Sequence, residues 1–302
     1  MVESVHKYMK VGLIHPMAYP ETLRGEGPIL ETIRRICMDE YFTAIEITHI
    51  ADDDVRKKVA KMVDTASMAV GFSAQPMLLT RGLNINDIDE EGRAEAVRVL
   101  KGGIDEAYAL GARGFAYLSG NYEENNKEAY YEALVKSTLE LCDYAKEKGD
   151  LKIILEVFDF DVDKKSLIGP VDLAVRFAQD ICGQRDNFGM MVDLSHLPLV
   201  REDSKTAILP LKEYLVHAHL GNAVVEEGKE AYGDAHPRFG FPNSANDLEE
   251  MVEYLRVLKD MGFLNPNNPP IVSFEVKPWG DEDPELVIAN AKRMLNQAWA
   301  RV

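Results

Sequence analysis

The chain has 302 residues but no long apolar run, few cysteines and no low-complexity segment. No apolar stretch approaches the roughly 18 residues that a membrane-spanning helix needs, so we expect no membrane partner. The N-terminal residues MVESVHKYMK contain no apolar segment before a small-residue cleavage site, so we also expect no signal peptide. The three cysteines are an odd number and form no CxxC pair, which favours a reducing, cytoplasmic location over a disulfide framework.

Basic residues are also in short supply. Lysine and arginine number 34 against 51 aspartates and glutamates, which leaves a net charge of −17. Because an acidic surface repels phosphate backbones, we expect no nucleic-acid partner; such a chain suits an enzyme of neutral substrates, or one that holds cations. The sequence contains no P-loop, no GxSxG and no HExxH motif, so nothing marks it as a nucleotide phosphohydrolase, a serine hydrolase or a zincin.

What the sequence does contain is a regular alternation of short apolar runs and amphipathic stretches. The runs are rich in β-branched, aromatic and aliphatic residues, as expected of strands buried on both faces. They are Lys10–Ile14, Phe42–Thr48, Ala69–Ser73, Gly114–Leu118, Lys152–Val157, Gly189–Val192, Leu215–Leu220 and Ile271–Val276. Eight strands, each followed by a helix, predict an α/β fold, a single-domain (β/α)8 TIM barrel over residues 1–302. The alternative is a doubly wound open sheet, but its glycine fingerprint is incomplete, since Gly25-Glu-Gly27 lacks a third glycine.

The amphipathic stretches carry the end signals of helices. Asn246-Asp-Leu-Glu249 reads as a capping box, and Asp283-Pro284 supplies an N-cap followed by a proline in the first turn. Glycine follows the stretches Arg93–Leu110 and Lys127–Lys148, which predicts that both helices end there.

Charged residues stand where the strands are expected to end. Glu156, Asp193 and Glu275 end the fifth, sixth and eighth strands, and His219 ends the seventh. The carboxyl ends of barrel strands meet at one face, and an unpaired buried carboxylate is costly, so these groups must be paired, protonated or bound to a metal. Three carboxylates and one imidazole suit Mn²⁺, Mg²⁺, Co²⁺ or Zn²⁺. The alternative is structural ion pairing, for which Lys277, just past Glu275, is the clearest cation.

Six of the seven histidines follow or end predicted strands, which favours a site over scattered surface positions. They are His15, His49, His196, His217, His219 and His236. His217 shares a strand face with His219, so it either supports that residue or is a satisfied interior histidine. The loop YGDAHPRFG is either a solvated turn or a lid whose His236 and Arg238 meet the substrate.

Two further acidic residues, Asp234 and Glu46, each fit more than one role. His196, Asp234 and His236 together offer the donors for a second metal. Glu46 lies inside the second predicted strand, where interior polar packing and a role in the site fit the sequence equally well. Outside the four-residue metal set, the candidate substrate-binding residues are His196, His217, His236, Arg238 and Lys277.

The order of Glu156, Asp193-x-x-His196, His217-x-His219 and Glu275 at strand ends resembles the xylose isomerase-like TIM-barrel superfamily. The similarity is strongest to its sugar isomerases and epimerases of the D-tagatose 3-epimerase and hydroxypyruvate isomerase type, whose second strand the run YFTAIEIT also resembles. The resemblance implies one divalent ion on the four strand-end residues, with manganese, cobalt or magnesium as the common choices and no organic cofactor. It further implies that Glu156 and Glu275 are an acid/base pair working through a metal-bound enediolate, and that His196 contacts a substrate oxygen.

The sequence departs from the epimerase type in the loops. An arginine expected shortly after the strand-7 histidine is missing from LGNAVVEEG, and Arg238 is its candidate replacement. In the loop FDFDVDKKS, Lys164 and Lys165 could meet a substrate phosphate or stand exposed in solvent. Epimerisation and isomerisation are not distinguished by these residues. We expect a sugar or polyol ketone as substrate and a homo-oligomeric assembly.

Three alternative functions remain on the same scaffold. The endonuclease IV type of abasic-site nuclease shares the Glu, Asp-x-x-His and Asp-x-His donors, but the third and fourth strands here end in FSAQP and YLSGN, without its two further histidines. The charge of −17 also opposes DNA binding. A keto-inositol dehydratase would use the same enolate chemistry, and a non-catalytic metal- or sugar-binding barrel would not need two glutamates.

Overall fold

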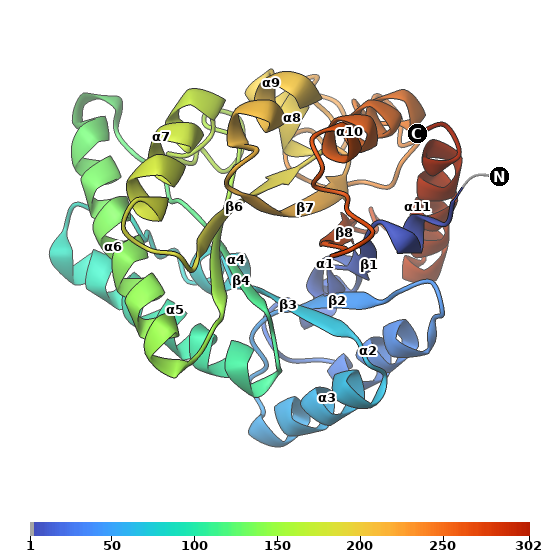
Figure 1. Cartoon of the computed structure of the whole chain (residues 1–302), viewed down its shortest axis with the longest axis horizontal. Coiled ribbons are helices and arrows are strands. Elements are labelled where there is room, and N and C mark those ends of the chain that lie inside the picture. The colour runs from blue at the N-terminus through green and yellow to red at the C-terminus, as the bar shows by residue number, and fades with distance from the viewer. Residues whose placement is uncertain (1–2) are drawn as a thin grey trace.

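A computed structural model describes residues 3–302, so the first two residues of the predicted domain lie outside it (Figure 1). Eight parallel strands form one sheet in the order β1-β8-β7-β6-β5-β4-β3-β2. The strands are β1 (Lys10–Leu13), β2 (Ala44–Ile47), β3 (Ala69–Ser73), β4 (Gly114–Leu118), β5 (Lys152–Glu156), β6 (Phe188–Asp193), β7 (Leu215–Gly221) and β8 (Ile271–Glu275). Each predicted strand is present within one residue of its expected bounds, apart from a two-residue trim at the start of β2.

The sheet curls into a nearly closed barrel. Seven of the eight neighbouring strand pairs form ladders, with one register shift in the β6–β7 pair, whereas β1 and β2 are joined by a single bridge between Ile14 and Glu46. Beside it, the Thr43 N–H donates to the Val11 carbonyl at 2.9 Å. The prediction of a (β/α)8 barrel is therefore confirmed, and the doubly wound open sheet is not what this chain forms.

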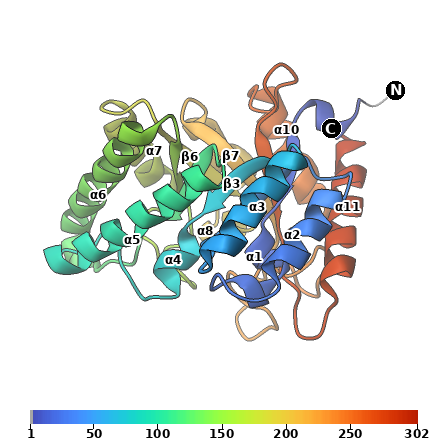
Figure 2. The same cartoon turned by 90° about the horizontal axis from the view of Figure 1, so that it is seen from below.

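Helices surround the strands as a ring in Figure 1 and lie along their outer side in Figure 2. The α-helices are α1 (His15–Ala18), α2 (Ile29–Met38), α3 (Asp53–Thr65), α4 (Gln75–Leu79), α5 (Glu90–Ala109), α6 (Lys127–Lys148), α7 (Val171–Cys182), α8 (His196–Val200), α9 (Ser204–Ile208), α10 (Leu248–Asp260) and α11 (Pro284–Trp299). Four short 3-10 turns are η1 (Val5–Lys7), η2 (Pro20–Thr22), η3 (Glu124–Asn126) and η4 (Leu209–Leu211). Among the described residues, no helix combines the length and apolar character needed to cross a membrane.

Most helix ends follow the sequence signals, with one shift. Helix α6 ends before Gly149, and α11 begins at Pro284 after the N-cap Asp283. The capping box of α10 uses Asp247 and Glu250, one residue later than expected. Asn246 is unavailable as a cap because its buried amide donates to the Leu194 carbonyl at 2.8 Å.

The core between sheet and helices is continuous, and a smaller apolar layer fills the inside of the barrel. That inner layer consists of Ala116, Ile154 and Met191, with Val216 packed against it. Ile154 and Met191 stand two residues before Glu156 and Asp193 on their strands, so they share the inward face one layer below those carboxylates. The apolar layer is thus the floor on which the polar side chains at the carboxyl ends rest.

Candidate metal centre and adjoining pocket

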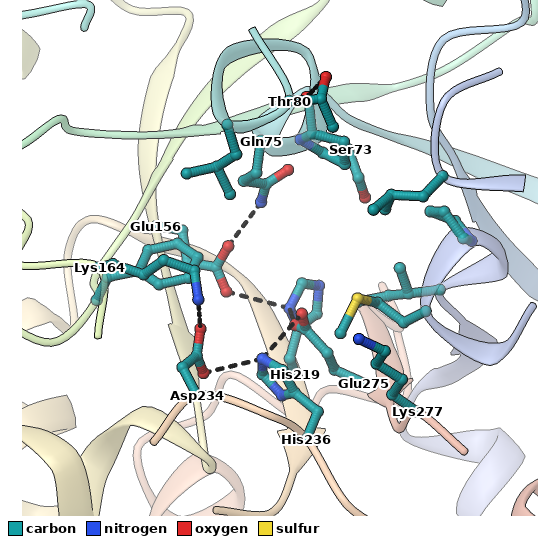
Figure 3. Close-up of a pocket in the computed structure, with 17 residues that line it drawn as sticks. Ser73, Gln75, Thr80, Glu156, Lys164, His219, Asp234, His236, Glu275 and Lys277 are labelled. Atoms are coloured by element: carbon teal, nitrogen blue, oxygen red, sulfur yellow. Dashed lines mark hydrogen bonds and ion pairs between the residues drawn. The ribbon is translucent and has the colours of Figure 1, made fainter. Parts of the chain in front are cut away.

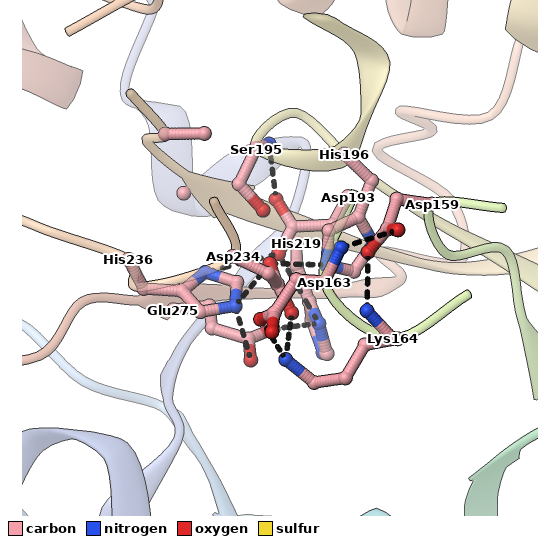
Figure 4. Close-up of polar contacts among 12 residues, drawn as sticks. Asp159, Asp163, Lys164, Asp193, Ser195, His196, His219, Asp234, His236 and Glu275 are labelled. Atoms are coloured by element: carbon pink, nitrogen blue, oxygen red, sulfur yellow. Dashed lines mark hydrogen bonds and ion pairs between the residues drawn. The ribbon is translucent and has the colours of Figure 1, made fainter. Parts of the chain in front are cut away.

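Four side chains from consecutive strands β5 to β8 converge at the carboxyl end of the barrel; Figure 3 shows those of β5, β7 and β8, and Figure 4 shows that of β6. They are Glu156, Asp193, His219 and Glu275, and one donor atom of each lies within 4.8 Å of the others. His219 Nδ1 is 2.8 Å from Glu275 Oε2, 3.3 Å from Glu156 Oε1 and 3.9 Å from Asp193 Oδ2. The parallel register produces this arrangement because adjacent strands end at nearly the same level.

The same four donor atoms are buried without a hydrogen-bond partner. They are Glu156 Oε1, Asp193 Oδ2, His219 Nδ1 and Glu275 Oε2. Although the distances between them are short, their directions do not satisfy hydrogen bonds to one another, so they aim at a common space. Leaving several polar atoms unsatisfied in the interior is costly. A divalent cation with nitrogen and oxygen ligands would satisfy all four, and the residues therefore fit such an ion.

Glu46 orients His219 from the far side of its ring. Glu46 Oε1 lies 3.0 Å from His219 Nε2 and 2.7 Å from His217 Nε2, while Ser73 Oγ donates to Glu46 Oε2 at 3.1 Å. Burial disfavours the charge on Glu46, but the two histidines hold its pKa well below the usual value, so the carboxylate accepts. His219 Nε2 consequently carries hydrogen, and Nδ1 faces the other three donors, as in carboxylate–histidine–metal arrangements.

Gln75, in the first turn of α4, holds the other carboxylate oxygen of Glu156. Its Nε2 donates to Glu156 Oε2 at 2.6 Å, which leaves Oε1 directed toward His219. Gln75 is not recognisable from sequence alone, because a neutral amide after a strand carries no charge or motif signal.

A second group lies beside the first and consists of His196, Asp234 and His236 (Figure 4). Asp234 Oδ1 is 3.1 Å from His196 Nε2 and 2.9 Å from His236 Nε2. His196 Nδ1 lies 2.8 Å from the Val157 carbonyl, which can only accept, so that nitrogen carries hydrogen. His236 Nε2 also approaches Glu275 Oε1 at 3.4 Å, which connects the two groups.

Lys164 occupies the open side of this second group. Its Nζ is 2.8 Å from Asp234 Oδ2 and 2.7 Å from Asp163 Oδ2. The loop that carries it is held by buried Asp159, whose carboxylate accepts the backbone N–H groups of residues 162, 163 and 164 at 2.8 Å (Figure 4). Lys164 therefore places an ammonium group at the site and is not a freely solvated loop lysine.

The charges at the site are dominated by acid, and the pKa values of the histidines respond. Burial opposes protonation of His196 and His236, but Asp234 outweighs it and raises the pKa of His196 to about 10 and that of His236 to about 9. Burial, together with the neighbouring Glu275, raises the pKa of Asp193 to about 6. Neighbouring carboxylates contribute to all three shifts, and for Asp193 burial is the larger cause.

A pocket of about 190 Å³ opens next to the donors and is lined by three of them, Glu156, His219 and Glu275. Its polar side includes Ser73, Gln75, Thr80 and Lys277, as well as Lys164 and the acidic residues (Figure 3). Apolar side chains of the segments after β1 and β3 form the opposite wall, namely Ile14, Pro16, Met17, Leu23, Pro76 and Leu79. Such a pocket suits a small polar molecule that is shielded from water on one side.

The remaining sequence candidates lie away from this pocket. Arg238 donates from Nε to Glu282 Oε1 at 2.8 Å, and His236 before it has a left-handed backbone with φ 50°, which redirects the chain. His217 faces Glu46 and the opposite end of the barrel. His15 is buried against the Thr32 hydroxyl at 2.7 Å, and His49 contacts Glu106 at 2.7 Å.

Comparison with solved structures gives matches over almost the whole chain. A D-psicose 3-epimerase with D-tagatose from Clostridium cellulolyticum H10 is 18% identical, with a TM-score of 0.66 over 97% of this chain and 96% of that chain. An IolI protein with a bound zinc atom is 20% identical, with a TM-score of 0.73 over 97% and 99%. An AP endonuclease of family 2 from Brucella melitensis is 18% identical, with a TM-score of 0.69 over 93% and 97%.

These identities are low, so the likenesses show the fold and not the activity. A comparison with curated protein sequences finds no match. Residues 39–298 match the model of the xylose isomerase-like TIM barrel family, which spans seven of the eight strands. The resemblance drawn from the strand-end residues is thereby confirmed, and the chain belongs to the xylose isomerase-like TIM barrel family.

Proposed function

We propose that this protein is a divalent-metal-dependent epimerase or isomerase of a small keto-sugar or related polyol ketone. The observation that carries the proposal is the convergence of four unpartnered donors, from Glu156, Asp193, His219 and Glu275, beside a small pocket. A divalent cation held there, such as Mn²⁺, Co²⁺, Mg²⁺ or Zn²⁺, would polarise a substrate carbonyl and stabilise the negative charge that develops on its oxygen.

The two glutamates are the proton-transfer groups in this proposal. Burial raises the pKa of Glu275, but His236 and His219 outweigh it and lower the pKa below the usual value, so the group is ionised and able to accept a proton. Glu156 is fixed by Gln75 through one oxygen, which leaves the other free to act. One carboxylate removes a proton from the carbon next to the carbonyl, and a carboxylic acid returns it to the same or the neighbouring carbon.

The pocket's other residues would bind and orient the substrate. The hydroxyl hydrogens of Ser73 and Thr80 are donated to Glu46 Oε2 and to the Pro76 carbonyl, so their oxygens can accept from substrate hydroxyl groups. Lys277 offers an ammonium group to substrate oxygens, while Met17 and Leu79 exclude water on the opposite side. His196, with its Nδ1 hydrogen held by the Val157 carbonyl, is fixed in orientation beside Asp234. A neutral polyhydroxy ketone suits this combination of polar and apolar walls.

A multi-metal nuclease is the second candidate, because His196, Asp234 and His236 could hold another cation. Lys164 argues against it, since its ammonium group lies 2.8 Å from Asp234 Oδ2 and already supplies a positive charge there. The chain's net charge of −17 also disfavours approach to DNA. We therefore favour one ion per chain.

Proton exchange in D₂O tests the proposal. The metal-loaded protein is incubated with D-fructose, D-psicose, D-tagatose and a keto-inositol, and loss of C–H signal is followed by NMR. Exchange should occur with at least one ketone and fall by about 10²-fold or more in Glu156→Gln and in Glu275→Gln. Glu106→Gln, a partly buried glutamate outside the site, is the matched control and should retain exchange.

Two outcomes would overturn the proposal. Absence of exchange with every ketone, in protein shown by elemental analysis to contain its metal, would exclude the proton-transfer reaction on these substrates. Cleavage of an abasic-site duplex, abolished by the same two substitutions, would favour the nuclease.

A further inference from the structure

A second and larger pocket lies at the opposite, amino-terminal mouth of the barrel. Its volume is about 590 Å³, against about 190 Å³ for the pocket at the carboxyl ends. It is lined by the first residues of several strands, including Lys10 of β1, Gly114 of β4, Lys152 of β5 and Ile271 of β8. Its size falls within the range of about 300–1,000 Å³ that is typical of small-molecule sites.

The lining of this pocket is basic, although the chain as a whole is strongly acidic. Lys10, Arg113, Lys152 and Lys212 all line it, and Glu213 is the one acidic residue among its lining side chains. Within residues 3–302, none of these four cations forms an ion pair with a carboxylate; Lys152 Nζ donates only to the backbone carbonyl of Asp186, at 2.9 Å. Many cations elsewhere do form such pairs, as in Arg185–Asp143 and Arg301–Glu249, whereas in the described part of the chain the four that surround this hollow do not.

Four unpaired cations around one hollow repel each other and focus a positive potential into it. In a protein with 17 more acidic than basic residues, carboxylates are abundant, yet within residues 3–302 none forms an ion pair with these four groups, although Glu213 also lines the pocket. The concave, partly apolar setting strengthens their field, because the low-dielectric walls screen it less than water does. An anion with more than one negative charge is the ligand that this arrangement favours.

The floor of the pocket adds a second requirement. Ile154 and Val216, which belong to the apolar layer inside the barrel, form this floor, and Met261 and Phe263 add further apolar side chains to the lining. Inorganic phosphate would engage the rim but leave this floor in contact with water. We propose that the pocket binds a small phosphorylated organic molecule, with its phosphate among Lys10, Arg113, Lys152 and Lys212 and its organic part on the apolar floor.

The position of His217 places the occupant close to the metal centre. His217 lines the basic pocket and also contacts Glu46 Oε1 at 2.7 Å. The same oxygen lies 3.0 Å from His219 Nε2. A molecule bound in the basic pocket would therefore be connected to His219, a candidate metal ligand, through the imidazole of His217 and the carboxylate of Glu46.

Isothermal titration of the metal-loaded full chain tests the site with three probes: AMP, inorganic phosphate and adenosine. AMP should bind more tightly than phosphate, and adenosine should bind least, because only AMP satisfies both rim and floor. In the double variant Arg113→Ala/Lys212→Ala, AMP affinity should fall at least about tenfold, as expected when charge-assisted contacts are lost. The matched control, Lys58→Ala/Lys61→Ala, removes two exposed lysines of α3 and should leave the affinity unchanged.

Both substituted residues are exposed at the rim, so the fold should survive, and circular dichroism checks this. Three results would overturn the proposal. One is no binding of AMP by the unsubstituted protein at millimolar concentration. Another is AMP binding that the double variant leaves intact. The third is binding that disappears when the metal is removed, since this would assign AMP to the carboxyl-end site.

Discussion

Glu46 Oε1 lies 3.0 Å from His219 Nε2, although their strands, β2 and β7, are not neighbours in the sheet. The contact therefore crosses the interior of the barrel. It determines which nitrogen of His219 carries hydrogen, and hence which one faces Glu156, Asp193 and Glu275. Glu46 is not one of the four donors, but through this contact it sets the orientation of His219, the imidazole among them.

Replacing Glu46 by glutamine should lower metal affinity by about 10–100-fold, the usual effect of removing a carboxylate that orients a metal-binding histidine. Competition with a metal-sensitive chelator dye measures the change. Ser73→Ala is the control, because Ser73 donates to the other oxygen of Glu46 at 3.1 Å and does not contact His219. Equal affinities for Glu46→Gln and the unsubstituted protein would contradict the assigned role.

Gln75→Leu should reduce kcat by about tenfold with a smaller change in KM. The substitution removes the 2.6 Å hydrogen bond to Glu156 Oε2, so the carboxylate loses its fixed orientation while the pocket keeps its shape. Steady-state kinetics on the ketone identified by exchange provide the measurement. Gln179→Leu, at an exposed glutamine of α7 away from the pocket, is the matched control, and a comparable loss in that variant would show that the effect is not specific to Glu156.

Lys164→Met should raise the metal content from one ion per chain toward two. Without the ammonium group 2.8 Å from Asp234 Oδ2, that carboxylate loses one of its cationic partners, and a metal ion can take its place by displacing the protons of His196 and His236. Elemental analysis after dialysis counts the ions. Lys165→Met is the matched control on the same loop, and an unchanged count in Lys164→Met would mean that the lysine does not exclude a second ion.

Acid should destabilise the protein in part through His15. Burial lowers the pKa of its imidazole to about 3, whereas an unfolded chain has a histidine pKa near 6.5. Between these values the unfolded state binds the proton and the folded state does not, so stability is lost as pH falls below about 6.5, by up to about 1.4 kcal/mol per pH unit. The difference in unfolding free energy between the unsubstituted protein and His15→Gln should therefore shrink by about 2 kcal/mol from pH 7 to pH 5. Chemical denaturation at both pH values measures it; a difference that does not change with pH would contradict the assignment.

The fold and the four central donors are predictable from sequence because their signals are local. Glu156, Asp193 and Glu275 are charges at the ends of apolar runs, and His219 is a polar residue in the same place on the strand between. Parallel strands of similar length necessarily bring such ends together. The polar residues at the strand ends and the topology of the parallel barrel are therefore enough to predict this part of the site.

The supporting residues could not be derived in the same way because their contacts are not local. Glu46 meets histidines that lie more than 170 positions later in the chain, and Lys164 meets Asp234 from a loop whose shape depends on Asp159. Arg238 shows the reverse case, in which a residue close to the site in sequence lies away from it in the structure. It follows His236 by two residues, but the left-handed turn at His236 and the carboxylate of Glu282 direct it away from the pocket.

Glu46 also lies where the barrel closes, at the junction of β1 and β2. The bridge that joins β1 to β2 pairs Ile14 with Glu46, whereas every other neighbouring pair of strands has a full ladder. Local opening of a barrel begins where the fewest backbone bonds must break. Here that opening would displace the carboxylate that aligns His219, so release of a bound ion and the first step of unfolding would be the same event.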